Sequence, residues 1–163
     1  MSQPSTFWWQ KFGTLAQMAQ ATVALLGFVA VLFQIDEIRT GNRATSARQA
    51  FLGYTDLAFR NPKFSLPDYD VIKKGSRDQQ VQYESFVSYF LYACEEAMAA
   101  FAGRREWIAS CNYDLKPHLP FLCEKNQAEP GYLATYSTVT QDWVTASLKT
   151  ASVAPPDCKL GKT

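Results

Sequence analysis

The longest apolar stretch of the chain lies near its start. Residues 21–33, ATVALLGFVAVLF, contain no charged or strongly polar side chain, and they lie inside a longer charge-free segment, residues 12–35. Twenty-four helical residues extend about 36 Å, whereas the hydrocarbon core of a bilayer is about 30 Å thick. We therefore predict a single transmembrane helix over residues 12–35.

The flanks of this segment favour a membrane span over a buried helix of a soluble protein. We expect residues 1–11 to form an interfacial segment, since they include three side chains typical of the headgroup zone: Trp8, Trp9 and Lys11. Gln17 and Gln20 are the polar residues of the first turns. They either lie in the interface as well, or form amide hydrogen bonds between neighbouring spans of an oligomer.

The alternative of a cleaved signal peptide is disfavoured, because no small-x-small cleavage site follows Phe33. Arg39, Arg43 and Arg48 follow the span closely, whereas Lys11 alone precedes it. By the positive-inside rule we predict a single-pass protein of the bacterial inner membrane, with its N-terminus outside and its C-terminal domain in the cytoplasm.

After the span, apolar residues recur at helical spacing in four further segments. They predict a first helix over residues 44–61, ended by Pro62, a second from the capping box at Ser76 to Gly103, a third over 104–112 and a last over 131–149. The stretches between them, which contain most of the prolines, are predicted to be loops. The first helix either continues from the span through Arg39 or restarts near Gly41.

These segments predict an all-α protein, with one N-terminal transmembrane helix and a small cytoplasmic domain of about four helices. The domain covers residues 36–150, and residues 151–163 are expected to be a disordered tail. No Gly/Ser linker separates the span from the domain, so the two are expected to be mechanically coupled.

The cysteines show no paired framework in the sequence and are interpreted as buried thiols of a reducing compartment: Cys94, Cys111, Cys123 and Cys158. The formal net charge of +1 says little about partners. Glu95 and Glu96 are adjacent, so they do not face one site together, and we interpret them as a solvated helix face.

Candidate catalytic chemistry is sparse. The one histidine, His118, lies in no recognisable triad, and the spacing of Cys111, Asp114, His118 and Cys123 matches no common zinc site. The eight glycines form no phosphate-binding loop. We therefore expect no enzymatic activity, no metal and no cofactor.

Binding is better supported, because cationic and aromatic residues fall at helix ends and in loops. The candidate ligand-binding residues are Arg104, Arg105, Trp107, Arg60, Asn61, Lys63, Lys116 and His118. Guanidinium groups and an indole face would suit phosphates and bases if these side chains meet in space. The alternative is ordinary surface charge.

The architecture, together with the segments FRNPKFSLPDYD and YESFVSYFLYACEEAM, resembles the membrane-bound ancillary effectors of type III CRISPR antiviral defence. The resemblance implies a cyclic oligoadenylate ligand, cyclic tetra-adenylate, bound on the axis of a homotetramer that perturbs membrane lipid, with no DNA partner. The rivals are a structural or regulatory membrane subunit that binds a protein partner, and an enzyme that uses His118.

Overall fold

The computed structural model describes the backbone of residues 7–150 and the side chains of residues 17–150. The predictions for the side chains of Trp8, Trp9 and Lys11, and for the tail over 151–163, lie outside these residues. In the described part of the chain every regular element is helical, which confirms the all-α fold. The chain divides into two units, Met1–Asn42 and Arg43–Thr163, which we describe separately.

The first unit is the apolar part of α1 (Phe7–Arg60). Its side chains from residue 17 to residue 42 are all exposed. The most apolar eighteen-residue window of the segment Gln17–Arg60 has a mean hydropathy of 2.0 and no buried residue. By length and composition, this helix is able to cross a membrane. Thr22 Oγ1 donates to Met18 O at 2.9 Å, so its hydroxyl is satisfied inside the helix, as a lipid environment requires.

α1 continues through Gly41 and ends where the sequence predicts. The Asn61 side chain donates to Leu57 O at 3.0 Å, and its backbone N–H bonds the same carbonyl. The next residue, Pro62, starts the short helix α2 (Pro62–Ser65). The helix α1 therefore includes both the apolar segment and the first helical residues of the second unit.

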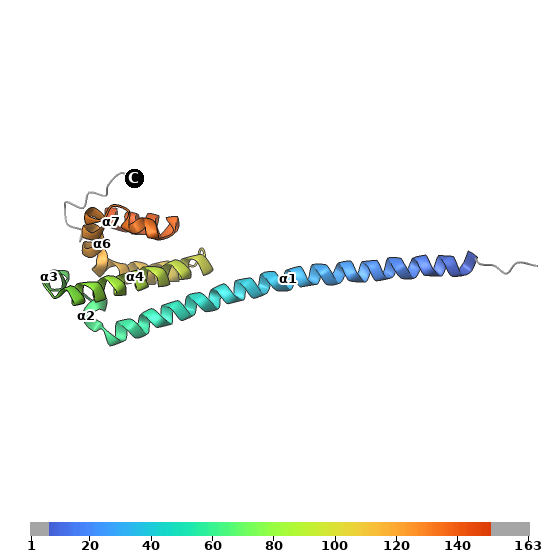
Figure 1. Ribbon diagram of the computed structural model, residues 1–163, viewed down its shortest axis with the longest axis horizontal. Coiled ribbons are helices and arrows are strands. Elements are labelled where there is room, and N and C mark those ends of the chain that lie inside the picture. Colours follow the sequence, from blue (N-terminus) through green and yellow to red (C-terminus); the bar gives the residue numbers. More distant parts are fainter. Residues whose placement is uncertain (1–6, 151–163) are drawn as a thin grey trace, which may run out of the picture. The chain divides into compact units, whose positions relative to one another are not determined.

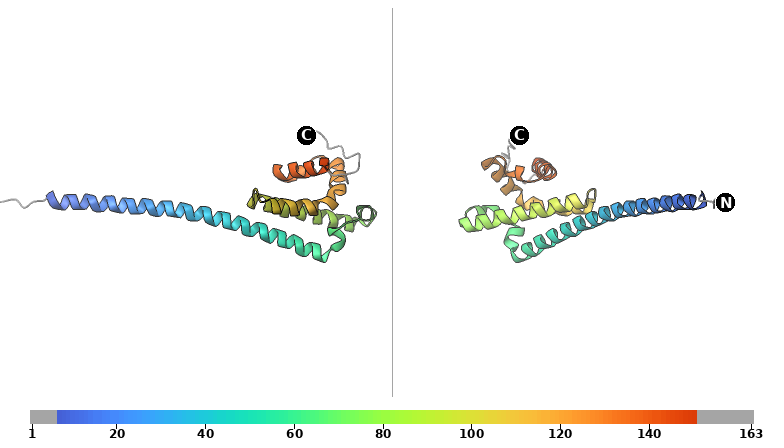
Figure 2. Two further views of the ribbon diagram at one scale, coloured as in Figure 1. Left: turned by 180° about the vertical axis from the view of Figure 1, so that it is seen from behind. Right: turned by 45° about the vertical axis from the view of Figure 1, so that its right-hand side comes forward.

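The central element of the second unit is α4 (Arg77–Ala100), which begins at the predicted cap, where Ser76 Oγ accepts from Gln79 N. It lies between the C-terminal part of α1 and the helices α6 and α7 (Figures 1 and 2). Tyr54 of α1 packs on Phe90 of α4, with ring centroids 5.0 Å apart. One face of α4 belongs to the core: Tyr83, Phe86, Val87, Phe90, Leu91, Cys94 and Ala97 are buried.

Two predicted loops contain helices. The stretch after Pro62 forms α2 and α3 (Tyr69–Lys73), the latter capped by Asp68, whose Oδ1 accepts from Val71 N at 3.2 Å. The stretch after the third predicted helix forms a 3₁₀ turn, η1 (Lys116–His118), and α6 (Leu119–Ala128). Prolines suggested loops here, but Pro62, Pro117 and Pro120 occupy the first turns of α2, η1 and α6, where no backbone N–H donor is needed.

The remaining helices differ from the predicted ones in where they begin and end. α5 (Arg105–Leu115) is longer than predicted and follows a turn at Gly103, which has a φ of +82° that favours glycine. The predicted last helix starts late, since a 3₁₀ turn, η2 (Tyr132–Thr135), precedes α7 (Thr138–Thr150).

Glu95 ties α4 to the start of α7. Its Oε2 accepts from the Ser137 backbone N–H at 3.1 Å and from Thr140 Oγ1 at 2.7 Å. The interpretation of Glu95 as part of a solvated face is therefore wrong, because its carboxylate is a hydrogen-bond acceptor at the start of a packed helix.

The interpretation of the cysteines as buried thiols is also wrong. Cys94 of α4 and Cys111 of α5 form a disulfide, with Cα atoms 5.9 Å apart and both side chains fully buried. Cys123 is disulfide-bonded as well, so within the described residues no cysteine is a free thiol. The sequence pattern does not reveal the pair, because the two cysteines lie on different helices that meet only in the folded domain.

Candidate functional site

The arginines of the predicted ligand site lie at two different places in the domain. Arg60 is the last residue of α1 and pairs with Asp56 at 2.9 Å. Arg104 occupies the N-cap position of α5 without a side-chain capping hydrogen bond, and it pairs with Glu106 at 3.3 Å. A backbone hydrogen bond, together with the hydrogen bond from Arg104, lowers the pKa of Glu106. Both ion pairs are exposed, so they contribute little to stability.

The other predicted residues are also separated. Trp107 stacks on Phe101, with centroids 5.0 Å apart and the rings almost parallel. Lys63 lies over the ring of Phe64 at 5.0 Å. Asn61 lines a cleft beside α1 and α4, whereas Lys116 lines a different one beside α5 and α7. Binding of a cyclic oligoadenylate by these residues stays a prediction.

His118 is removed from the surface altogether. Its side chain has no exposed area, and its Nδ1 is 2.9 Å from the Tyr83 hydroxyl. Phe86 and Phe90 flank the imidazole, with ring centroids 5.8 and 5.6 Å from it. Burial lowers the pKa of His118 to about 4 and raises that of Tyr83, so this buried pair is neutral at pH 7. In this position the imidazole is a packing residue of the domain core.

The metal alternative has no support from the described geometry. Cys111 is bonded to Cys94, and His118 contacts Tyr83. Among the residues that the structure describes, no three histidine, cysteine or acidic side chains gather closely enough to hold an ion.

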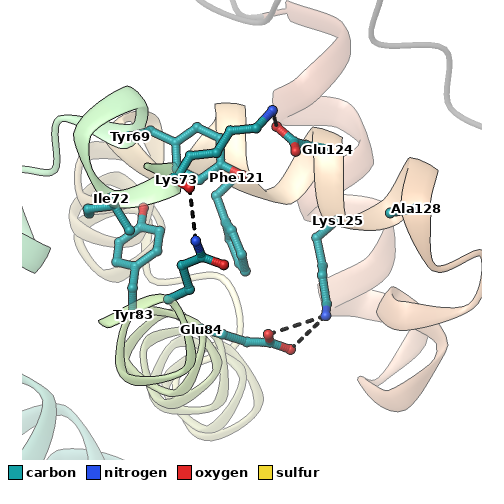
Figure 3. Close-up of a pocket in the computed structure, with 10 residues that line it drawn as sticks. Tyr69, Ile72, Lys73, Tyr83, Glu84, Phe121, Glu124, Lys125 and Ala128 are labelled. Carbon is teal, nitrogen blue, oxygen red and sulfur yellow. Dashed lines mark hydrogen bonds and ion pairs between the residues drawn. The ribbon is translucent and has the colours of Figure 1, made fainter. Parts of the chain in front are cut away.

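A cleft that the sequence does not predict lies between α3, α4 and α6 (Figure 3). Its volume is about 340 Å³. Three aromatic rings form its floor: Tyr69 from α3, Tyr83 from α4 and Phe121 from α6, with centroids 5.2 to 6.2 Å apart. Tyr83 and Phe121 are buried, so the floor is part of the core.

Two ion pairs bound the cleft on opposite sides. Lys73 Nζ is 2.8 Å from Glu124 Oε2, and Lys125 Nζ is 3.0 Å from Glu84 Oε1 (Figure 3). Each pair joins a residue of α6 to one of another helix, so the rim is held by cross-helix contacts. Lys125 also pairs with Glu129 at 2.6 Å, and the hydrogen bonds that its ammonium group donates to Glu129 and Glu84 raise its pKa.

The hydroxyl of Tyr69 is held at the same rim. Burial, together with the charge and hydrogen bond of Glu124, raises the pKa of Tyr69 to about 12. The hydroxyl therefore stays protonated at pH 7 and is able to donate. Gln80 supplies a further polar group, anchored because its amide donates to Lys73 O at 2.8 Å.

This arrangement combines an apolar floor with an equal number of ammonium and carboxylate groups at the rim. It suits a ligand with an apolar or aromatic body and hydrogen-bonding groups of both kinds. It offers no surplus of positive charge for a polyphosphate. The signal for the cleft in the sequence is the helical spacing of Phe121, Glu124 and Lys125, within a stretch that the prolines predict to be a loop.

The fold and the cleft define the class of this protein as an all-α domain carried on an apolar helix that is able to span a membrane. Comparison of the chain with protein-family models, with curated proteins and with solved structures finds no match. The resemblance to CRISPR effectors therefore stays a prediction.

Proposed function

We propose that this protein is a single-span membrane subunit whose helical domain binds a segment of a protein partner in the cleft between α3, α4 and α6. The observation that carries the proposal is the cleft itself: an aromatic floor that belongs to the core, beneath a rim of two ion pairs. The role is structural or regulatory, without chemistry on the partner.

The chemistry of the cleft favours a peptide segment over a nucleotide. An apolar side chain would cover the rings of Tyr69 and Phe121, whereas backbone N–H and C=O groups would bond the carboxylates and ammonium groups. A volume of about 340 Å³ accommodates one or two side chains. A cyclic oligonucleotide would bring several negative charges to a rim whose cations already have anionic partners.

A non-enzymatic role is supported by where the reactive groups lie. The only histidine of the chain is buried against Tyr83. Three carboxylates near the cleft form ion pairs with lysines: Glu84, Glu124 and Glu129. A general acid or base among these groups would need to leave its partner before it acted.

The disulfides bear on the side of the membrane that the domain faces. Disulfide bonds persist in oxidising compartments and are rare in a reducing cytoplasm. The predicted cytoplasmic location of the domain rests on the three arginines that follow the span, compared with one lysine that precedes it. Because the buried Cys94 and Cys111 are bonded to each other, we propose that the domain faces the oxidising side of the membrane.

The cleft proposal is tested by site-specific crosslinking in the full-length membrane protein. A photoreactive phenylalanine derivative replaces Gln80 or Ala128 at the rim of the cleft, or Ala146 on α7 as the matched exposed control. We expect a discrete protein adduct from the first two positions and none from the control. The adduct from position 80 should disappear when Ala128→Trp fills the cleft.

Equal adducts from all three positions, or no adduct at the rim, would overturn the cleft as the binding site. Topology is measured separately. A reporter enzyme that is active only after export is fused to the chain after residue 150. Activity of this reporter supports the oxidising side. Its inactivity, together with fluorescence of a second fusion that is fluorescent only in the cytoplasm, supports the cytoplasmic side.

A further inference from the structure

One disulfide of the second unit has a single cysteine among the described residues. Cys94 and Cys111 are bonded to each other, whereas Cys123 of α6 is disulfide-bonded to neither of them and is almost completely buried. The sequence contains four cysteines, and the fourth is Cys158, eight residues after the end of α7. Within this chain Cys158 is therefore the one cysteine left to pair with Cys123.

A further cleft of the second unit lies at the end of α7, and we name it the α7 cleft. It has a volume of about 340 Å³. Leu115 and Leu119 are buried and give it an apolar wall. Its lining residues come from α5, η1, α6 and α7: Asn112, Leu115, Lys116, Leu119, Ser147 and Thr150.

A bond between Cys123 and Cys158 would make residues 151–157 begin and end beside the α7 cleft. Residue 151 follows Thr150, which lines the cleft. Cys123 lies one helical turn after Leu119, which also lines it, and residues four apart share one face of a helix. Seven extended residues span up to about 25 Å, so this segment is long enough to cross from α7 to α6, against which α7 packs.

The composition of residues 151–157, ASVAPPD, suits this cleft. Val153 and the two prolines are apolar, like the leucine wall. Asp157 is opposite in charge to Lys116, which forms no salt bridge within the described residues. Prolines also lose little backbone entropy when a chain is fixed, because their φ is already set. An adjacent segment of this chain is therefore a fitting occupant.

We propose that Cys123 and Cys158 form a disulfide that ties the C-terminal segment to α6, with residues 151–157 docked in the α7 cleft. The bond closes a covalent loop that contains η2 and α7, so α7 stays beside α6 while the bond is intact. The proposal rests on the oxidising location proposed above for the formation of the bond. It is independent of the cleft between α3, α4 and α6.

Formation of the bond is an oxidation by thiol–disulfide exchange. Each of the two thiols loses one proton and one electron, and a sulfur–sulfur bond joins Cys123 to Cys158. A disulfide of an exchange partner in the oxidising compartment accepts both protons and both electrons, and it becomes two thiols.

The pairing is tested by peptide mapping of the full-length chain, purified in detergent and equilibrated in a glutathione redox buffer. Free thiols are alkylated in denaturant, and the chain is then digested without reductant. We expect a linked peptide pair that contains Cys123 and Cys158, and no alkylated Cys123. The Cys94–Cys111 pair is the internal control. Equilibrating a mixture of chains with natural and heavy nitrogen shows whether each bond lies within one chain.

Alkylated Cys123 in the wild type, with or without the Cys94–Cys111 pair, would overturn the proposal. A linked pair that combines a light and a heavy chain would overturn it as well. The buffer sets the redox conditions, so these outcomes do not depend on the side of the membrane that the domain faces. A cytoplasmic result from the reporter fusions contradicts the location alone, and loss of the crosslinks at positions 80 and 128 contradicts the other cleft alone.

Docking in the α7 cleft is tested by the equilibrium constant for closing the Cys123–Cys158 bond against glutathione. Ser147→Trp fills the cleft, and Ala146→Trp adds the same side chain at the adjacent exposed position. We expect Ser147→Trp to lower the constant at least about ten-fold, the factor that corresponds to losing the burial of one apolar side chain such as Val153. Ala146→Trp should leave it within about two-fold.

The constant for the Cys94–Cys111 bond in the same samples reports whether each variant is folded. Val153→Asp is the second docking variant, since it lies outside the packed helices and should also lower the Cys123–Cys158 constant about ten-fold. Gly161→Asp, beyond Cys158, is its control. Equal constants for Val153→Asp and Gly161→Asp, or for the two tryptophan variants, would overturn the docking.

Discussion

His118 shows how burial changes the role of a residue whose chemistry is otherwise versatile. Its Nδ1 contacts the Tyr83 hydroxyl, whereas Nε2 has no hydrogen-bond partner within the described residues. A charged imidazole at this position would lose its hydration among aromatic rings, so the neutral form is strongly favoured. The residue that the sequence offers as a ligand or base is therefore a packing residue in the folded domain.

We predict a pH dependence of stability from this histidine. Its pKa is about 4 in the folded domain and 6.5 without burial, so between these values the unfolded chain binds a proton that the folded one does not. The contribution is fully present above pH 6.5 and is lost as the pH falls to about 4, by about 3 kcal/mol. Denaturant unfolding of the detergent-solubilised protein at several pH values measures this.

The control is His118→Asn, which keeps a polar group near Tyr83 but does not titrate. Its free energy of unfolding should vary less steeply with pH over the same window. Parallel curves for the two proteins would show that other groups cause the dependence.

At the scale of elements, the second unit is held by contacts between helices that are distant in the chain. Glu95 of α4 satisfies groups at the start of α7, and Gly53 of α1 lets Tyr89 of α4 approach closely, because a Cβ at position 53 would overlap the Tyr89 hydroxyl. Lys73 and Lys125 connect α3 and α4 to α6. The buried aromatic floor of the cleft, formed by Tyr83 and Phe121, belongs to the same core that these helices share.

The role of Glu95 leads to a prediction with a neighbour as its control. Glu95→Ala leaves the Ser137 N–H and the Thr140 hydroxyl without their acceptor, and we expect a loss of about 1 to 2 kcal/mol in the free energy of unfolding. Glu96→Ala removes an adjacent carboxylate and should change it by less than about 0.5 kcal/mol. Chemical denaturation compares the two, and equal losses would contradict the cap.

For the whole molecule, the disulfide between α4 and α5 and the continuous α1 set the organisation. Cys94 and Cys111 are 17 residues apart and close a loop through the turn at Gly103. α1 joins the apolar segment to the domain without a break in its helix. Within the second unit, α1 enters the domain core at Ala47 and Tyr54.

Removal of this disulfide should destabilise the domain without unfolding the apolar helix. A loop of this size corresponds to about 3 kcal/mol of restricted unfolded-state entropy. We expect the double variant Cys94→Ala, Cys111→Ala to lower the free energy of unfolding by about that amount, and added reductant to have a smaller effect on it than on the wild type. An unchanged stability in the variant would show that the bond does not form in the native membrane protein.

The sequence by itself determined the all-α class, the apolar helix, the end of α1 near Asn61 and the cap of α4 at Ser76. These features follow from helical spacing and from side chains within four residues of each other, which a linear pattern records. Tertiary structure alone decided the burial of His118, the Cys94–Cys111 bond and the cleft between α3, α4 and α6. Each of these depends on helices that are far apart in the chain and meet only when their apolar faces are buried together.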